Sequence, residues 1–166
     1  GMDLLKALRI LIPPATQSLE YKDADLLAFY EYYAINSEPW DGPAGIVAFD
    51  GRYAACTVDR NGLRPARWQL SDDRVFMVAS EAGVWDVETA RILAKGKLGP
   101  GQMIAADLDS GRLLDSDAID QINRARAPYK QWLKQGMTYL HTELVDPNLT
   151  AVPFDATHQW GEGDVI

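Results

Sequence analysis

The chain has 166 residues, of which 47% are hydrophobic and 24% are charged, and this composition suits one ordinary folded domain or a large piece of a bigger one. Its 16 basic and 24 acidic side chains give a formal charge of −8. That balance argues against nucleic-acid binding, because phosphate recognition needs an excess of Lys and Arg on one face. The sequence contains no run of eighteen apolar residues, so we expect no membrane span.

Residues that could bind a metal or form a disulfide are scarce. The single cysteine, Cys56, excludes an internal disulfide framework and a multi-thiolate metal site. Only two histidines, His141 and His158, are present, so we expect no metal site. The first residues lack the basic stretch and apolar run of a secretory signal, so we expect a cytoplasmic protein.

The first part of the chain is predicted to be helical. Leu and Ile recur at helical spacing over residues 2–12 and stop before two prolines. Residues 23–35 give the clearest helical pattern, with Asp23 as the cap and apolar or aromatic residues at steps of three and four.

From residue 44 the apolar pattern changes to a period of two, which is typical of strands. Three pairs of β-rich runs flank short turns, the first of them at Asp50-Gly51, a strong hairpin signal. These pairs are 44–49 with 52–58, 67–70 with 74–79, and 102–108 with 112–114.

The remaining segments complete an α+β arrangement in which helices flank a central antiparallel sheet. Residues 87–93 are predicted to form a helix, and 96–101 a Gly/Pro loop. Asp115 opens a further helix to about residue 125, which resumes over 129–134 after Pro128.

Positive charge is concentrated in the middle of the chain. Residues 51–105 hold 8 basic and 6 acidic side chains, which is half of all the cations. The densest stretch is DRNGLRPAR at 59–67, directly after a predicted strand. Its arginines could recognise a carboxylate, since the guanidinium is a planar two-pronged donor. Alternatively, the stretch is a tight turn whose arginines pair with Asp59, Glu81 or Asp86.

Other possible sites are weaker. Cys56 lies in the middle of a predicted strand with no nearby base, which favours a buried core residue over a nucleophile. Glu81, at a strand end, is expected to neutralise a neighbouring arginine. The KGKLGPG stretch at 95–101 lacks the GK[ST] arrangement of a phosphate loop. The residues alone therefore show no nucleophile–base pair, metal cluster or cofactor motif.

Four ordered motifs carry a resemblance to a known family: EPWDGPA at 38–44, DRNGLRPAR at 59–67, ASEAG at 79–83 and KGKLGPGQM at 95–103. From about residue 2 to 140 the chain resembles the glutamine amidotransferase domain of the glutamate synthase large subunit. The resemblance implies part of an N-terminal-nucleophile hydrolase fold, an α/β/β/α sandwich of antiparallel sheets between helical layers. Residues 1–141 correspond to the downstream portion of this domain, and 142–166 are expected to form an irregular tail or linker.

The resemblance also implies a function. The family hydrolyses glutamine to glutamate and ammonia, and the ammonia is used on another domain that carries FMN and an iron–sulfur cluster, so no cofactor is expected in this chain. The family nucleophile is an amino-terminal cysteine whose own α-amine is the base. No cysteine precedes Cys56 here, and the upstream His-Asn-Gly-Glu type motif of the oxyanion hole is also absent.

We therefore expect a chain that is inactive alone and that works with an upstream amidotransferase half and the other glutamate synthase domains. The first alternative is a non-catalytic scaffold or regulatory half-domain that forms a homodimer or binds the upstream half. A second is a free-standing hydrolase that uses Cys56. No catalytic residue is assigned. The positions taken over from the family motifs are expected to support the sheet beneath the active site: Asp59, Asn61, Gly62, Arg64, Arg67, Ser80 and Glu81.

Overall fold

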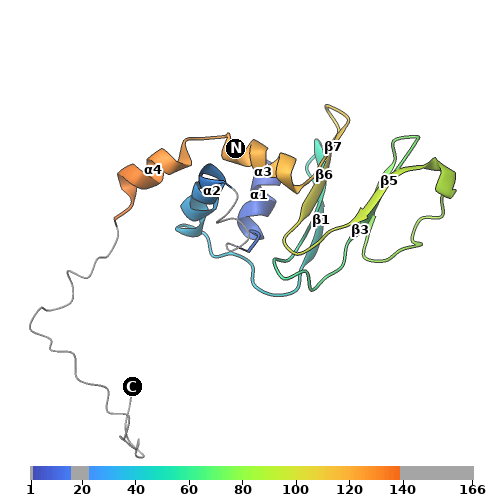
Figure 1. Ribbon diagram of the computed structural model, residues 1–166, viewed down its shortest axis with the longest axis horizontal. Helices are drawn as coiled ribbons and strands as arrows, with labels where there is room; N and C mark the ends of the chain where they lie inside the picture. The colour runs from blue at the N-terminus through green and yellow to red at the C-terminus, as the bar shows by residue number, and fades with distance from the viewer. Residues whose placement is uncertain (1, 16–22, 139–166) are drawn as a thin grey trace, which may run out of the picture. The chain divides into compact units, whose positions relative to one another are not determined.

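A computed structural model describes residues 2–15 and 23–138, so the predicted tail at 142–166 lies outside the described residues. The described helices and strands follow one another along the chain (Figure 1). They are α1 (Leu4–Leu11), α2 (Ala24–Ala34), β1 (Gly45–Phe49), β2 (Tyr53–Val58), β3 (Arg67–Ser71), β4 (Phe76–Ala79), the 3₁₀ turn η2 (Thr89–Arg91), β5 (Ile92–Lys97), β6 (Met103–Asp107), β7 (Arg112–Leu114), α3 (Ser116–Arg124) and α4 (Tyr129–Gly136). None of the described helices is long and apolar enough to cross a membrane.

The predicted helices over 2–12, 23–35, 115–125 and 129–134 are all confirmed, and three of them begin at an aspartate. The carboxylate of Asp3 accepts a hydrogen bond from the Lys6 amide, that of Asp23 from the amides of the first turn of α2, and that of Asp115 from the Ala118 amide. Each carboxylate satisfies amide groups that have no partner within the helix.

The three predicted hairpins are also confirmed, as the antiparallel pairs β1–β2, β3–β4 and β6–β7. The predicted helix over 87–93 is wrong, because only η2 is helical and Ile92 begins strand β5. The predicted loop at 96–101 is wrong at its start for the same reason, since Gly96 and Lys97 belong to β5. β5 carries small residues where it faces the core, so the alternation of apolar and polar residues that marks a strand is weak in its sequence. Its pairing with β3 sets its extended conformation.

The strands form two antiparallel sheets instead of one central sheet. The four-stranded sheet has the order β1-β2-β6-β7, and the three-stranded sheet has the order β4-β3-β5. Helices α1 and α3 pack against the four-stranded sheet, and α2 packs against α3 and α4. Viewed from the side, the described part has helices, one sheet and then the second sheet (Figure 1). This α+β arrangement agrees with the predicted fold class.

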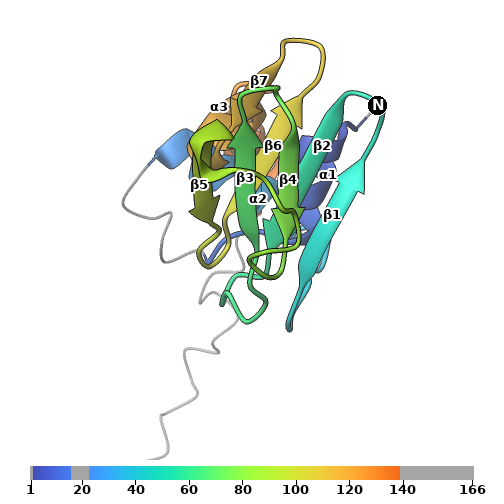
Figure 2. The ribbon, with the colours of Figure 1, turned by 90° about the vertical axis from the view of Figure 1, so that its right-hand side faces the viewer.

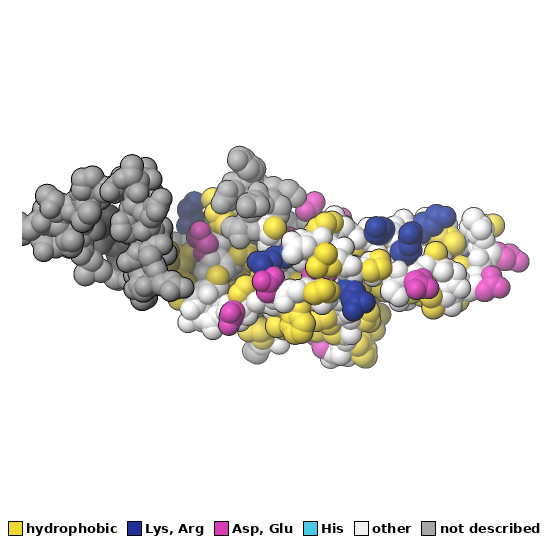
Figure 3. All heavy atoms as spheres, turned by 90° about the horizontal axis from the view of Figure 1, so that it is seen from below, with side chains coloured by type: hydrophobic (Ala, Val, Ile, Leu, Met, Phe, Trp, Pro, Cys, Tyr) yellow, Lys and Arg dark blue, Asp and Glu magenta, His cyan; other side chains and the backbone are white. Residues whose placement is uncertain are grey.

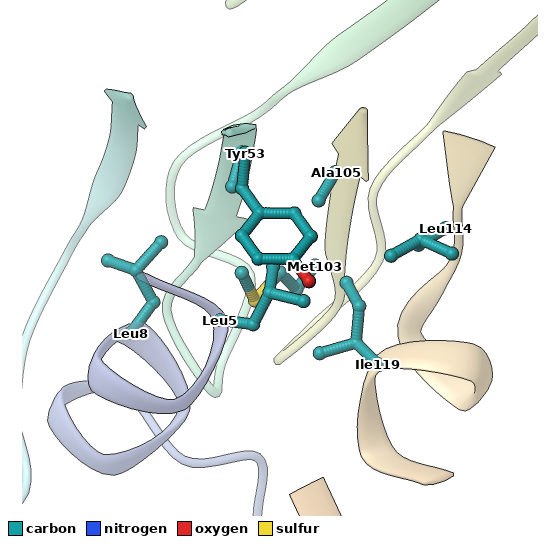
Figure 4. Close-up of a cluster of buried hydrophobic side chains, with 8 residues drawn as sticks. Leu5, Leu8, Tyr53, Met103, Ala105, Leu114 and Ile119 are labelled. Carbon is teal, nitrogen blue, oxygen red and sulfur yellow. The ribbon is translucent and has the colours of Figure 1, made fainter. Parts of the chain in front are cut away.

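Strand β2 is buried on both faces and joins two cores. Toward the helices, Tyr53 and Ala55 pack with Leu5, Met103 and Ile119 (Figure 4). Toward the other sheet, the side chains that alternate with them form a second cluster with the three-stranded sheet. Its members are Cys56, Val58, Ala66, Leu98 and Ile104, with Trp68, Phe76, Val78 and Leu113 packed against them.

A buried arginine connects the helices to each other. Arg9 of α1 is 1% exposed, and its Nε lies 2.9 Å from Oδ1 of Asp120 in α3. The hydroxyl of Tyr30 in α2 donates to the same Oδ1 at 2.9 Å. Burial raises the pKa of the Asp120 carboxyl, and the Arg9 charge acts against that shift. A further guanidinium nitrogen of Arg9 donates to the carbonyl of Gly101 at 2.8 Å, outside the helical layer.

Replacing Gly96 by alanine is predicted to destabilise the fold. A Cβ at this position would lie 2.7 Å from Nε1 of Trp68, its cross-strand neighbour in the core between the sheets. The indole would have to move, so we expect Gly96→Ala to lower the free energy of unfolding by about 2 kcal/mol. Chemical denaturation followed by tryptophan fluorescence measures this change.

The matched control is Gly136→Ala at the end of α4, where a Cβ meets nothing within 4 Å. We expect this variant to be as stable as the parent or up to about 1 kcal/mol more stable, because alanine favours the helix. Equal stabilities for the two variants would contradict the packing role of Gly96.

Candidate active-site cleft between β1 and β4

The loop after β2 is organised by the buried carboxylate of Asp59, which is 2% exposed. Its Oδ1 accepts hydrogen bonds from the amides of Asn61 and Leu63 at 3.1 and 3.0 Å. Its Oδ2 accepts from the amides of Arg64 and Ala44, both at 3.1 Å. One side chain therefore fixes the DRNGLRP turn and ties it to the segment that enters β1.

The four hydrogen bonds from backbone amides also determine the charge state of Asp59. Burial alone would raise the pKa of this carboxyl, but the amide donors together outweigh burial and hold the pKa below its usual value. The group is thus a carboxylate at neutral pH, and its charge is stabilised by backbone dipoles without an arginine.

The Asn61-Gly62 turn packs tightly on the loop between β5 and β6. Gly62 has a φ of +66°, and a Cβ there would lie 2.9 Å from Cγ of Pro100. The amide of Gly101 donates to the carbonyl of Asp59 at 2.9 Å, and the Gly101 carbonyl accepts from Arg9. A continuous hydrogen-bonded path therefore runs from the helical layer to the turn.

A cleft of about 630 Å³ opens between the edge strands β1 and β4, beside this turn. It is lined by the segment before β1, by β1 itself, by the end of the DRNGLRP turn and by the end of β4. The lining residues are Trp40, Pro43, Ala44, Gly45, Ile46, Val47, Cys56, Arg64, Pro65, Ala66, Val78, Ala79, Ser80 and Glu81. A larger hollow of about 840 Å³ lies along residues 124–131 and 134, and it contains none of the predicted positions.

The structure brings only some of the seven predicted positions to the cleft. Arg64, Ser80 and Glu81 line it, although they come from separate motifs. Asp59, Asn61 and Gly62 form the turn that holds Arg64 in place, and Arg67 lies in β3. The sequence analysis missed the contribution of 40–47, and the EPWDGPA motif that precedes β1 was the available signal for it.

The charges at the cleft are not neutralised in the way the sequence suggested. The prediction that the arginines of 59–67 pair with Asp59, Glu81 or Asp86 is wrong, because Arg60 pairs with Asp41 at 2.8 Å and the Asp59 carboxylate is occupied by amides. Among the described residues, neither Arg64 nor Glu81 has an ion-pair partner. Glu81 therefore does not have its predicted neutralising role.

Cys56 lies at the base of the cleft but is unsuited to nucleophilic attack. It is 1% exposed and belongs to the core between the sheets. Burial raises the pKa of its thiol to about 11, so very little thiolate is present at neutral pH. This agrees with the prediction of a core residue.

Both strands that border the cleft have a free edge in the described part of the chain. β1 pairs only with β2, and β4 pairs only with β3. On β1, Val47 and Phe49 are opposite Cys56 and Ala54, on the face that looks toward the other sheet. That sheet does not reach over them, and they are 69% and 63% exposed. Hydrophobic side chains form a patch along one edge of the molecule (Figure 3).

Replacing Asp59 by asparagine is predicted to destabilise the protein by about 3 kcal/mol, because an amide of the same size leaves one oxygen to serve four amide donors. The effect depends on pH. A carboxylate with a lowered pKa stabilises the fold above the ordinary pKa near 4, and this stabilisation is lost as the pH falls below it. The difference in unfolding free energy between parent and Asp59→Asn should therefore shrink from pH 6 to pH 3.

The control for this prediction is Asp117→Asn on the exposed first turn of α3, which we expect to change stability by less than about 0.5 kcal/mol. A difference between the parent and Asp59→Asn that stays constant down to pH 3 would contradict the proposed charge state of Asp59.

The Cys56 thiol is predicted to resist alkylation. With a pKa of about 11 and 1% exposure, it should react with iodoacetamide at neutral pH at least about 100-fold more slowly in the folded protein than in urea. Mass spectrometry of the quenched reaction measures both rates. Fast labelling of the folded chain would restore Cys56 as a candidate nucleophile.

The chain is similar to known proteins over most of its length. Residues 1–132 match the family model for class-II glutamine amidotransferases. The chain is 43% identical over 143 residues to the ferredoxin-dependent glutamate synthase of Antithamnion sp., which covers 82% of this chain and 9% of that protein. It is 42% identical over 139 residues to the chloroplastic ferredoxin-dependent enzyme of Oryza sativa subsp. japonica (81% and 8%).

A third relative is the NADH glutamate synthase of Schizosaccharomyces pombe, at 37% identity over 156 residues. This match covers 94% of the chain and 7% of the relative, so the chain spans less than a tenth of the length of each of these three proteins. The family model matches most of the chain, and the three relatives are 37–43% identical to it over most of its length. The chain therefore belongs to the class-II glutamine amidotransferases, of the type found in glutamate synthases.

Proposed function

We propose that the chain forms part of a glutaminase that supplies ammonia for glutamate synthesis, and that the nucleophile is provided by another polypeptide segment. The observation that carries this proposal is the cleft between β1 and β4. It contains the charges of Arg64 and Glu81, which have no ion-pair partner in the part of the chain that the structure describes, and its only thiol is the buried Cys56. A site of this kind has binding groups but lacks the group that attacks.

The missing group would be a cysteine at an amino terminus, as the family resemblance implies. Its α-amine takes the thiol proton, the thiolate attacks the carboxamide carbon of glutamine, and the resulting α-ammonium gives the proton to the nitrogen that leaves as ammonia. Water then hydrolyses the thioester to glutamate and regenerates the thiol. In this scheme the chain holds the substrate: the Asp59 turn fixes the backbone of Arg64 at the cleft, and Ser80 and Glu81 also line it.

The two free strand edges support the placement of the added segment. A strand paired with β4 would extend the three-stranded sheet over the exposed Val47 and Phe49. Such a strand would bury apolar surface and satisfy the backbone groups of an open edge, both of which are liabilities in an isolated chain. The segment would thus reach the cleft from the side that this chain leaves open.

The residues of this chain do not suit an iron–sulfur cluster. An iron–sulfur cluster is held by several cysteine thiolates, whereas the sequence has one cysteine and it is buried. Within the described ranges, no group of three or more His, Cys, Asp or Glu side chains could hold a metal ion. We propose that FMN and the cluster bind to other domains, and no step of the glutaminase reaction is assigned to them.

A second candidate function is a non-catalytic scaffold that self-associates. The exposed apolar residues Val47 and Phe49 on the open edge of β1 favour it, because edge strands of this kind readily pair with a second copy. Analytical ultracentrifugation, which measures whether the chain forms a dimer, distinguishes the two candidate functions. A stable homodimer that buries β1 would favour the scaffold, and dissociation of that dimer by the upstream amidotransferase half would favour the glutaminase.

The decisive measurement is release of glutamate from glutamine. We expect no activity from this chain alone, and glutamate release at least about 100-fold above background once it is mixed with a separately produced upstream amidotransferase half that bears a processed amino-terminal cysteine. Arg64→Ala should lower the kcat/KM of the mixture by about tenfold or more, since it removes a charge from the cleft. Lys130→Ala, on the exposed face of α4, is the matched control and should have no effect.

Activity of the chain alone would overturn the proposal and point back to Cys56. Binding of the two halves without glutamate release would favour the non-catalytic scaffold as the function of the chain. Equal losses in Arg64→Ala and Lys130→Ala would show that Arg64 has no specific role there.

A further inference from the structure

The guanidinium of Arg9 is buried in the helical layer, yet one of its nitrogens is directed to a loop of the sheets. Nε and one terminal nitrogen lie 2.9 and 3.2 Å from the two carboxylate oxygens of Asp120 in α3. The other terminal nitrogen donates to the carbonyl of Gly101 at 2.8 Å, in the loop between β5 and β6. Arg9 therefore serves two layers of the fold at once.

The stability of the helical layer alone does not account for this arginine. A buried ion pair loses the hydration of both charges, and apolar residues of similar volume often stabilise a protein equally well or better. The ion pair with Asp120 uses only part of the guanidinium. An apolar side chain could not donate to the Gly101 carbonyl, so this hydrogen bond is the contact that requires Arg9.

Gly101 lies where the segment after α1 meets the DRNGLRP turn. Its φ is +66°, and a Cβ there would lie 3.0 Å from Cα of Pro14 and 3.7 Å from Cα of Arg60. Its amide donates to the carbonyl of Asp59 at 2.9 Å. A shift of this loop relative to α1 would therefore change its contacts with the DRNGLRP turn as well.

The DRNGLRP turn extends this constraint to the cleft. The Asp59 carboxylate accepts from the amides of Arg64 and Ala44, and both of these residues line the cleft. Helix α1 contacts the lining a second time, because the Trp40 amide donates to the Leu11 carbonyl at 2.8 Å. Figure 2 shows α1 behind the four-stranded sheet, with β3 and β4 in front of it. These hydrogen bonds thus connect the helical layer to a cleft between the sheets.

We infer that Arg9 is a positioning residue for the cleft, which acts through Gly101 and the Asp59 turn to hold Arg64 where the substrate binds. The inference rests on the proposed function for the role of Arg64, and it assigns no chemical step to Arg9 itself. A group that is fixed before the substrate arrives loses little freedom on binding, so the positioning should lower the KM for glutamine. Without the Arg9 contact, the turn should open locally while the domain stays folded.

The first test is amide hydrogen exchange in the full chain alone. Arg9→Met by itself would leave the Asp120 charge buried without a partner, so the test variant is Arg9→Met/Asp120→Leu/Tyr30→Phe, which replaces the whole polar network by apolar side chains. Amides in the middle of β2 report the stability of the whole domain. Relative to them, we expect the three turn amides that donate to the Asp59 carboxylate to exchange at least about tenfold faster than in the parent.

The matched control is Tyr30→Phe, which removes the 2.9 Å hydrogen bond to Asp120 but leaves the contact between Arg9 and Gly101 intact. Exchange of the turn amides, measured against β2 in the same way, should stay within about twofold of the parent. Equal exchange in the triple variant and the control would overturn the inference, whether or not the chain takes part in a glutaminase.

The second test separates positioning from general stabilisation in the mixture with the upstream amidotransferase half. At a temperature where all variants are folded, the triple variant should raise the KM for glutamine at least about fivefold and change kcat by less than about twofold. In an Arg64→Ala background the same three substitutions should change kcat/KM by less than about twofold, because a side chain that is absent cannot be misplaced.

The two tests also distinguish this inference from the proposed function. Losses that multiply in the combined variant would show that Arg9 does not act through Arg64 and would overturn the inference. Faster exchange of the turn amides in the triple variant, with no glutamate release by the parent mixture, would overturn the proposed function alone.

Discussion

The buried carboxylate of Asp59 is the constraint on which the candidate site depends. A charge inside a protein must be matched, and here the match comes from four backbone amides of the same turn and of the segment before β1. The turn is rigid without an arginine partner, so the guanidinium of Arg64 stays available at the cleft. The route through Gly101 to Arg9 anchors this turn to the helices.

The two sheets differ in how completely they are covered, and this difference explains where the cleft lies. The four-stranded sheet has helices on one face and the second sheet on the other, which is why β2 is buried throughout. The three-stranded sheet is too narrow to reach β1 and has one face without a described helix. Among the described residues, the cleft lies where this layered arrangement remains open.

Much of this could be predicted from the sequence, where local signals were strong. Helices with an aspartate cap and hairpins with Asp-Gly or Ser-Gly turns were placed within a few residues. Strand β5 was missed, because Ala94 and Gly96 face the core where large apolar residues are normal. The bulky Trp68 opposite Gly96 leaves no room for a side chain there. The ion pairs of 59–67 were also mispredicted, because the Asp59 carboxylate is occupied mostly by amides of its own turn and Arg60 pairs with Asp41, 19 residues away. The roles of the seven motif positions stay a prediction.

The contact between Gly62 and Pro100 has a consequence for how such sequences can change over time. Any side chain at position 62 would overlap with the proline ring, and Gly101 is likewise confined by the backbone of Pro14 at 3.0 Å. The DRNGLRP and KGKLGPG motifs thus pack directly against each other. A side chain at position 62 requires a change at Pro100, so these two positions should vary as a pair among distant relatives.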